Sequence, residues 1–251
     1  MMERVRKALE RISTWIDDLL YPENVACLCC DHALGEDDVD RLCSDCRNAL
    51  LQLAVRQEER EASQHERLPE GIDELHAAFI YEGPAKKLVH RLKYESVRGA
   101  AVPLARQMAY LPSGEEELIV PVPTDPKRER RRGFNQSAVL AQLIADELGM
   151  QMETALVRME ERRPQTGLSA QERMENLVGC MRAKDAVNGK RVLLIDDVAT
   201  TGATISEAAR ALRKAGAKSV CVFAAARAEG DPMGEKDPFA LPQTGKHGEL
   251  R

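Results

Sequence analysis

From about residue 75 onward, short runs of apolar, β-prone residues alternate with longer segments in which apolar residues recur every three or four positions. The first pattern predicts buried strands, and the second predicts amphipathic helices. Strands that alternate with helices indicate an α/β domain with a parallel sheet flanked by helices. The predicted strands are Ala77 to Tyr81, Leu118 to Val122, Arg191 to Ile195 and Ser219 to Ala225.

Two of the predicted helices are followed by glycine. Gly149 follows a helical run that contains Leu140 and Ile144, and Gly216 follows a run that contains Leu212. Glycine commonly ends helices because it takes the left-handed conformation of the closing turn without a Cβ penalty. We therefore expect the two helices to end at these positions.

The part of the chain before residue 74 has a different organisation. Apolar residues spaced by three and four positions from Val5 to Leu20 predict an amphipathic helix, and a second helix begins near Asp45. Apolar residues then become too sparse between 56 and 70 to hold a core. We expect a helix and a cysteine module over 1–66, the α/β domain over 74–228 and a disordered tail over 229–251.

The composition is typical of a protein that folds in water. Of the 251 residues, 43% are hydrophobic and 31% are charged, and the apolar runs are shorter than a bilayer-spanning helix. The N-terminus lacks the apolar region of a secretory signal, so we expect a cytoplasmic protein without membrane insertion. The net charge of -5 conceals a basic run from Lys127 to Arg132. Such a run attracts phosphates of a small ligand or a nucleic acid, although a solvated charged loop accounts for it equally well.

Four of the seven cysteines form two C-x-x-C pairs. Each short turn aims two sulfurs at one point, so the pairs together predict a tetrahedral zinc site. A closed site of this kind stabilises a module too small to fold on its own core, which indicates structural zinc. Cys29 and His32 are alternative ligands within the same segment. The predicted ligands are Cys27, Cys30, Cys43 and Cys46.

The stretch from Arg191 to Thr204 is the most informative part of the sequence. An apolar strand leads to two adjacent carboxylates, Asp196 and Asp197, at the strand end where open α/β sheets bind ligands. A turn of small and hydroxyl residues follows and opens a helix, which lets backbone N–H groups approach a phosphate. We expect the carboxylates to accept hydrogen bonds from ribose hydroxyls. The residues expected to bind the 5-phosphate are Ala199, Thr200, Thr201, Gly202, Ala203 and Thr204.

This stretch resembles the signature with which type I phosphoribosyltransferases bind phosphoribosyl pyrophosphate (PRPP). Further segments make the chain similar to the ComF family, competence-associated phosphoribosyltransferase-like proteins that include GntX-type members. The similarity extends from about Leu20 to Ala228. Besides the cysteine pairs, the segments are Phe79-x-Tyr81-x-Gly83 followed by Leu92-Lys93-Tyr94; Val120-Pro121-Val122-Pro123; Arg132-Gly133-Phe134-Asn135-Gln136; and Gln165-x-x-Leu168 with Arg173-x-x-Asn176.

The resemblance implies two further parts of a PRPP site. The segment Val120 to Gly133 is similar to the pyrophosphate loop, and Arg158 to Asn176 has the chain position of the mobile hood. Mg²⁺ would bridge the pyrophosphate and ribose oxygens of the bound ligand. The implied contacts are Arg130, Arg131, Arg132 and Gly133 in the loop, and Arg162, Arg163, Gln165 and Arg173 in the hood.

Three functions remain open from the sequence. The first is a phosphoribosyltransferase, of the glycosyltransferase class, with an acceptor that the sequence does not identify. The second is a non-enzymatic accessory protein of DNA uptake, which binds single-stranded DNA, uses PRPP as a regulator and contacts competence-machinery proteins. The third is a zinc-stabilised interaction module, which leaves the acidic pair unexplained. For DNA binding, the basic residues that join the arginine-rich segment are Lys86, Lys87, Arg91, Lys93 and Arg98.

Overall fold

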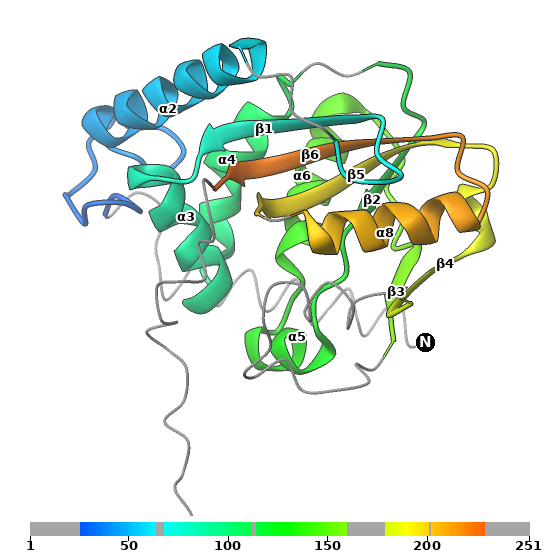
Figure 1. Cartoon of the computed structure of the whole chain (residues 1–251). Coiled ribbons are helices and arrows are strands. Elements are labelled where there is room, and N and C mark those ends of the chain that lie inside the picture. The colour runs from blue at the N-terminus through cyan, green and yellow to red at the C-terminus, as the bar shows by residue number, and fades with distance from the viewer. Residues whose placement is uncertain (1–25, 64–67, 112–113, 160–178, 201, 229–251) are drawn as a thin grey trace, which may run out of the picture.

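A computed structural model describes residues 26–63, 68–111, 114–159, 179–200 and 202–228. Within them a sheet of four parallel strands forms the centre of the molecule, in the order β1-β6-β5-β2 (Figure 1). All four predicted strands and their parallel arrangement are confirmed. The strands are β1 (Glu74–Ile80), β2 (Leu118–Pro121), β5 (Arg191–Ala199) and β6 (Ser219–Arg227).

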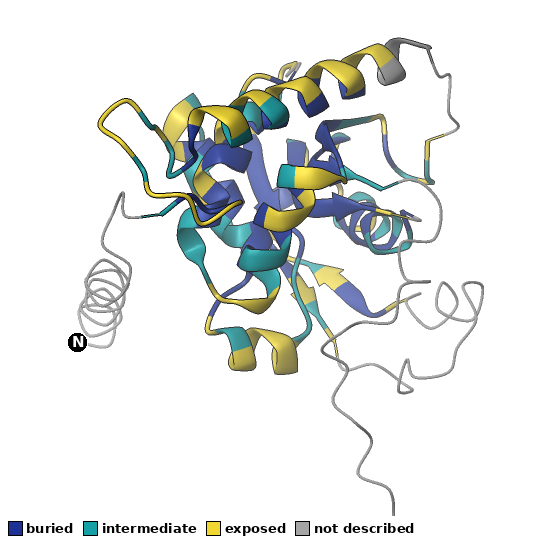
Figure 2. Cartoon of the chain, turned by 90° about the vertical axis from the view of Figure 1, so that its left-hand side faces the viewer, coloured by how far each residue is buried: buried dark blue, intermediate teal, exposed yellow. Residues whose placement is uncertain are grey.

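Helices cover both faces of this sheet, because the strand side chains alternate between two apolar clusters. Leu193 and Phe223 belong to the cluster that includes α3, α4 and α6, whereas Leu194 and Val222 belong to the cluster that includes α8. The strands are consequently buried on both sides (Figure 2). The helices are α2 (Ser44–Ser63), α3 (Gly83–Tyr94), α4 (Ala101–Met108), α5 (Pro126–Arg132), α6 (Gln136–Leu148) and α8 (Ala203–Lys214), with 3₁₀ turns at Arg98–Ala100 and Asp185–Val187.

The predicted helix ends are confirmed at both glycines. Gly149 caps α6 with a left-handed φ of 64°, and its N–H donates to the carbonyl of Ala145. Helix α8 ends at Lys214, and Gly216 takes a φ of 92° in the turn that leads to β6. A Cβ atom at Gly216 would displace the side chain of Asn188, and the left-handed φ strains other residues, so this turn favours glycine.

The cysteine segment and α2 pack against the sheet domain. Leu28, Leu50 and Leu53 are buried in the same apolar cluster as Phe79 and Leu88. Figure 2 shows the outer side of α2 exposed and its inner side facing the sheet domain. The predicted boundary between 66 and 74 stays a prediction, and the first helix and the tail over 229–251 lie outside the described residues.

A second, two-stranded sheet flanks residues 160–178. Strand β3 (Leu156–Arg158) pairs antiparallel with β4 (Met181–Ala183). The buried carboxylate of Glu207 in α8 accepts hydrogen bonds from the N–H groups of Gly179 and Met181, at 2.8 and 3.1 Å. This contact fixes the start of β4 against α8. Among the described residues, no helix has both the length and the apolarity needed to cross a bilayer.

Candidate functional site

The two adjacent carboxylates lie within strand β5, which is longer than predicted. The sequence predicted a strand that ends at Ile195, but β5 runs to Ala199 because β6 also continues and pairs with it up to Arg227. On the other side, the last paired residue of β2 is Pro121, opposite Ile195. Asp196 and Asp197 therefore lie on the part of β5 that has β6 on one side and no β2 partner on the other.

This position is a switch point in the chain connectivity. Strand β2 is followed by α5 and then by α6, which packs on one face of the sheet, whereas β5 is followed by α8 on the other face. Where the connections of neighbouring parallel strands diverge to opposite faces, their carboxyl ends form the usual ligand site of an open α/β sheet. The acidic pair lies at this point.

Both carboxylates are almost fully buried, with 7% of Asp196 and 4% of Asp197 exposed. Asp196 Oδ1 accepts hydrogen bonds from Ser137 Oγ at 3.2 Å and from the N–H of Asp197 at 2.9 Å. The ammonium of Lys93 lies 2.9 Å from Asp197 Oδ1. Groups from β5, α6 and α3 therefore meet around the acidic pair.

Burial and the neighbouring carboxylate determine the protonation of Asp196. Burial, and then the charge of Asp197, raise the pKa of Asp196 from 3.8 to about 7. Burial alone would lower the pKa of Lys93, but the negative charges of Asp197 and Asp196 outweigh it and raise that pKa. Because the native state binds the Asp196 proton more tightly than the unfolded chain, this group's stabilising contribution is complete below pH 3.8 and is lost as pH rises through about 7.

The turn after the carboxylates leads directly into α8. Ala199 is buried at the end of β5, and Thr200 is exposed. Gly202 precedes the helix with a left-handed φ of 76°, and a Cβ atom there would lie 3.0 Å from Pro69 Cγ. Ala203 and Thr204 form the first turn of α8 and are half-buried. Thr201 lies outside the described residues.

The segment expected to be a pyrophosphate loop contains a short helix. The Asp125 side chain caps α5 by accepting from the N–H groups of Lys127 and Arg128, and Gly133 ends it with a φ of 85°. Arg130 and Arg131 are exposed. Arg132 is half-buried and donates to Gln136. Burial lowers the pKa of Arg132, while the negative charge of Asp197 opposes this shift.

Helix α3 carries basic residues that bind other parts of the chain. Lys87 Nζ donates to the carbonyl oxygen of Cys29 at 2.9 Å, and Arg91 pairs with Asp31 at 2.7 Å. Lys93, two residues after Arg91, pairs with Asp197. Arg98, beyond the helix, lies over the ring of Phe134 at 4.9 Å. These four basic residues, which were expected to contribute to DNA binding, thus contact other parts of the protein.

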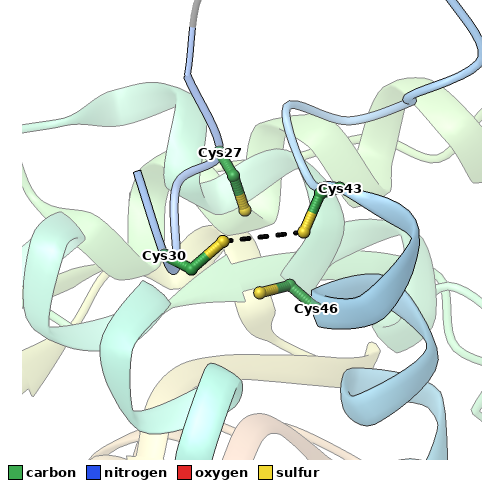
Figure 3. A group of neighbouring side chains, drawn as sticks. All are labelled: Cys27, Cys30, Cys43 and Cys46. Atoms are coloured by element: carbon green, nitrogen blue, oxygen red, sulfur yellow. Dashed lines mark hydrogen bonds between the residues drawn. The ribbon is translucent and has the colours of Figure 1, made fainter. Parts of the chain in front are cut away.

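The four cysteines of the two C-x-x-C pairs come together on one side of α3. Their sulfurs all lie within 4.8 Å of one another, and the Sγ atoms of Cys30 and Cys43 are 3.6 Å apart (Figure 3). A tetrahedral site with Zn–S bonds of about 2.3 Å places its sulfurs roughly 3.8 Å apart. Cys29 points elsewhere, with its Sγ 3.8 Å from the carbonyl oxygen of Pro84. The four thiols therefore fit a tetrahedral metal ion.

Backbone contacts favour a thiolate at one of these positions. Burial opposes ionisation of Cys27, but hydrogen bonds from the backbones of Cys43, Cys29 and Cys30 outweigh it and lower its pKa from 9.0 to about 7. Burial raises the pKa of Cys46, so among these two thiols it is Cys27 that favours the thiolate form that metals bind.

Comparison with known proteins fits this geometry. The model of the phosphoribosyl transferase domain matches residues 135–241. The DNA utilization protein YhgH of Salmonella typhimurium is 36% identical over 156 residues, which cover 59% of this chain and 69% of that protein. The competence protein ComFC of Streptococcus pneumoniae is 26% identical over 228 residues, which cover 88% of this chain and 97% of that protein. The chain belongs to the ComF family. Among solved structures, orotate phosphoribosyltransferase from Aeropyrum pernix is 18% identical with a TM-score of 0.33, over 68% of this chain and 79% of that one.

Two residues of this ComF protein's acidic site were missed by the sequence analysis. Ser137 directly follows the segment from Arg132 to Gln136, and Asn135 places it by capping α6 and donating to the carbonyl of Val122 at 2.9 Å. Lys93 lies in the Leu92-Lys93-Tyr94 segment, which was recognised as a family feature and interpreted as a basic surface. The predicted hood residues Arg162, Arg163, Gln165 and Arg173 lie outside the described residues, so their role stays a prediction.

Proposed function

We propose that this ComF protein binds PRPP or a similar ribose 5-phosphate at the carboxyl end of β5. The observation that carries the proposal is the buried pair Asp196 and Asp197, followed within the same segment by the turn into α8. Carboxylate oxygens accept hydrogen bonds from sugar hydroxyls, and the start of a helix with small residues favours a phosphate. We assign the ribose to the carboxylates and the 5-phosphate to residues 199–204.

The pyrophosphate of PRPP would be bound by the arginines of α5. Arg132 is the first candidate, because its guanidinium feels the negative charge of Asp197. Arg130 and Arg131 are exposed on the same short helix, and guanidinium groups bind phosphates in a bidentate manner. Mg²⁺, which prefers oxygen ligands, would neutralise charge between the pyrophosphate and the ribose.

The four-cysteine cluster is proposed to bind structural zinc. Cys27, Cys30, Cys43 and Cys46 offer four sulfurs, which complete a tetrahedral site and leave no position for a reacting water. Hydrogen bonds and ion pairs of Lys87 and Arg91 hold the first knuckle against α3. The metal would therefore fix the cysteine segment on the sheet domain.

A second candidate function is binding of single-stranded DNA. Lys127, Arg128, Arg130 and Arg131 are all exposed on α5, which makes this helix a compact basic surface. Two of the relatives are named for DNA utilization and competence. Basic side chains that neutralise DNA phosphates give an affinity that falls with salt concentration.

The proposed sugar-phosphate site predicts the behaviour of an isosteric double variant. Replacing Asp196→Asn and Asp197→Asn removes the two carboxyl groups that orient the ribose, so calorimetry with PRPP and Mg²⁺ should show at least a roughly 100-fold loss of affinity. Asp146→Asn, an exposed acid on α6, serves as the matched control and should bind normally. PRPP affinity that is the same in the double variant, with an unchanged circular dichroism spectrum, would refute the assignment.

The proposed zinc site predicts different effects for neighbouring cysteines. Cys46→Ser removes one ligand, so the purified protein should lose its stoichiometric zinc and unfold at lower denaturant concentration. Cys29→Ser changes a buried cysteine of the same segment that lies outside the cluster, and zinc content should be retained. Elemental analysis of both variants measures this, and equal zinc in wild type and Cys46→Ser contradicts the site.

The proposed DNA surface predicts a change in salt dependence. Replacing Lys127, Arg128, Arg130 and Arg131 with glutamine should reduce the slope of log affinity against log salt by up to about 2.8, at roughly 0.7 per single-strand phosphate contact. The control replaces four exposed lysines outside α5: Lys184, Lys190, Lys214 and Lys218. Fluorescence anisotropy with a labelled oligonucleotide measures both slopes. An equal slope in the two variants rules out α5 as the DNA surface.

A further inference from the structure

Lys93 gives the acidic pair a fixed positive charge. It lies in the last turn of α3, its side chain is 22% exposed, and its Nζ is 2.9 Å from Asp197 Oδ1. In the part of the chain that the structure describes, it is the one cation within ion-pair distance of either carboxylate. Lys87 and Arg91 also hold helix α3 against the cysteine segment, so the helix keeps the Lys93 ammonium in position.

The second oxygen of Asp197 has a different environment. Asp197 Oδ2 is buried, and no described residue donates a hydrogen bond to it. An unsatisfied buried carboxylate oxygen is costly, so its persistence indicates a partner that arrives with a ligand. A sugar hydroxyl is a suitable partner because it supplies a donor without adding charge.

The charges of Asp196, Asp197 and Lys93 decide whether a metal ion must also bind at the acidic pair. Two buried carboxylates without a counter-ion are strongly unfavourable, and a divalent cation is one way to compensate them. Here Lys93 supplies one positive charge from the protein itself. A second charge is not essential near neutral pH, because burial and the charge of Asp197 favour protonation of Asp196.

We propose that Lys93 is a positioning residue of the ribose site, which holds Asp197 through Oδ1, leaves Oδ2 to accept from a ribose hydroxyl, and makes binding of the sugar independent of a divalent cation. The inference rests on the proposed function and deepens it. It assigns two ligand classes to the site: ribose 5-phosphates that carry no pyrophosphate and bind without Mg²⁺, and PRPP, whose pyrophosphate brings the metal.

Isothermal titration of the full-length, zinc-loaded protein with ribose 5-phosphate tests the proposal. The buffer is freed of magnesium without a chelator, so that the metal of the cysteine cluster is retained. Wild type should bind with little change when Mg²⁺ is added. Lys93→Met should bind about 10- to 100-fold more weakly without Mg²⁺, the range for loss of a charged hydrogen bond, and should recover in part when Mg²⁺ is supplied.

Two other substitutions separate positioning from general damage. Lys93→Arg keeps the charge and should retain most of the affinity, whereas Lys86→Met changes an exposed lysine of the same helix and should behave as wild type. Inorganic phosphate, which needs only the turn over 199–204, should bind Lys93→Met and wild type equally. Normal ribose 5-phosphate binding by Lys93→Met, or an equal loss of phosphate binding, overturns the role of Lys93.

Asp197→Asn distinguishes this failure from failure of the proposed function. If Asp197→Asn binds weakly and Lys93→Met binds normally, the sugar site stands and the inference about Lys93 is wrong. If wild type fails to bind, or Asp197→Asn binds as wild type does, the proposed function fails as well.

If Lys93→Met does not fold, its combination with Asp197→Asn provides the test. This double variant removes both partners of the ion pair, so no unpaired charge stays buried at Asp197. This double variant should bind ribose 5-phosphate as Asp197→Asn alone does, because Lys93 acts through Asp197. A further loss of affinity contradicts the proposal.

Discussion

The ion pair between Lys93 and Asp197 is the contact on which the organisation of the site depends. Two adjacent carboxylates at the end of a buried strand are tolerated only when charge and hydrogen bonds compensate them. Lys93 from α3 and Ser137 from α6 supply that compensation from two elements far apart in the sequence. The site therefore requires α3 and α6 to pack on the same face of the sheet, which is where the larger apolar cluster places them.

Helix α3 connects the two chemical centres of the protein. Its middle contacts the first cysteine knuckle through Lys87 and Arg91, and its last turn contacts the acidic pair through Lys93. The cysteine cluster thereby contributes to the position of Lys93, a residue of the proposed sugar site. This arrangement gives a physical reason for a four-cysteine segment beside a phosphoribosyltransferase-like sheet.

The sequence was sufficient to predict the parts of the structure that are set by local patterns. Alternating apolar runs predicted four parallel strands, and Gly149 marked a helix end, because burial and backbone conformation leave direct traces in residue type. The C-x-x-C spacing predicted which sulfurs meet, since each pair is brought together by a short turn. The acidic pair was predicted at the end of its strand but lies within it, because the strand's extension to Ala199 depends on pairing with β6, which local preference does not encode.

The sequence did not predict contacts that depend on packing over long separations. A lysine among other basic residues on a helix is typical of a solvated surface, and only the tertiary fold brings Lys93 next to Asp197. Ser137 was missed for the same reason, since a serine in the first turn of a helix has no chemical signature of its own. The short helix α5 was expected to be a loop, because its run of charged residues shows no apolar periodicity.

A crystal structure of the zinc-loaded protein with ribose 5-phosphate tests the central claim most directly. The account predicts sugar hydroxyls within about 3.2 Å of the carboxylate oxygens of Asp196 and Asp197, with the Lys93 ion pair retained and the phosphate against the backbone N–H groups of 199–204. A ligand bound away from the acidic pair, or turn N–H groups that point away from the phosphate, would contradict it.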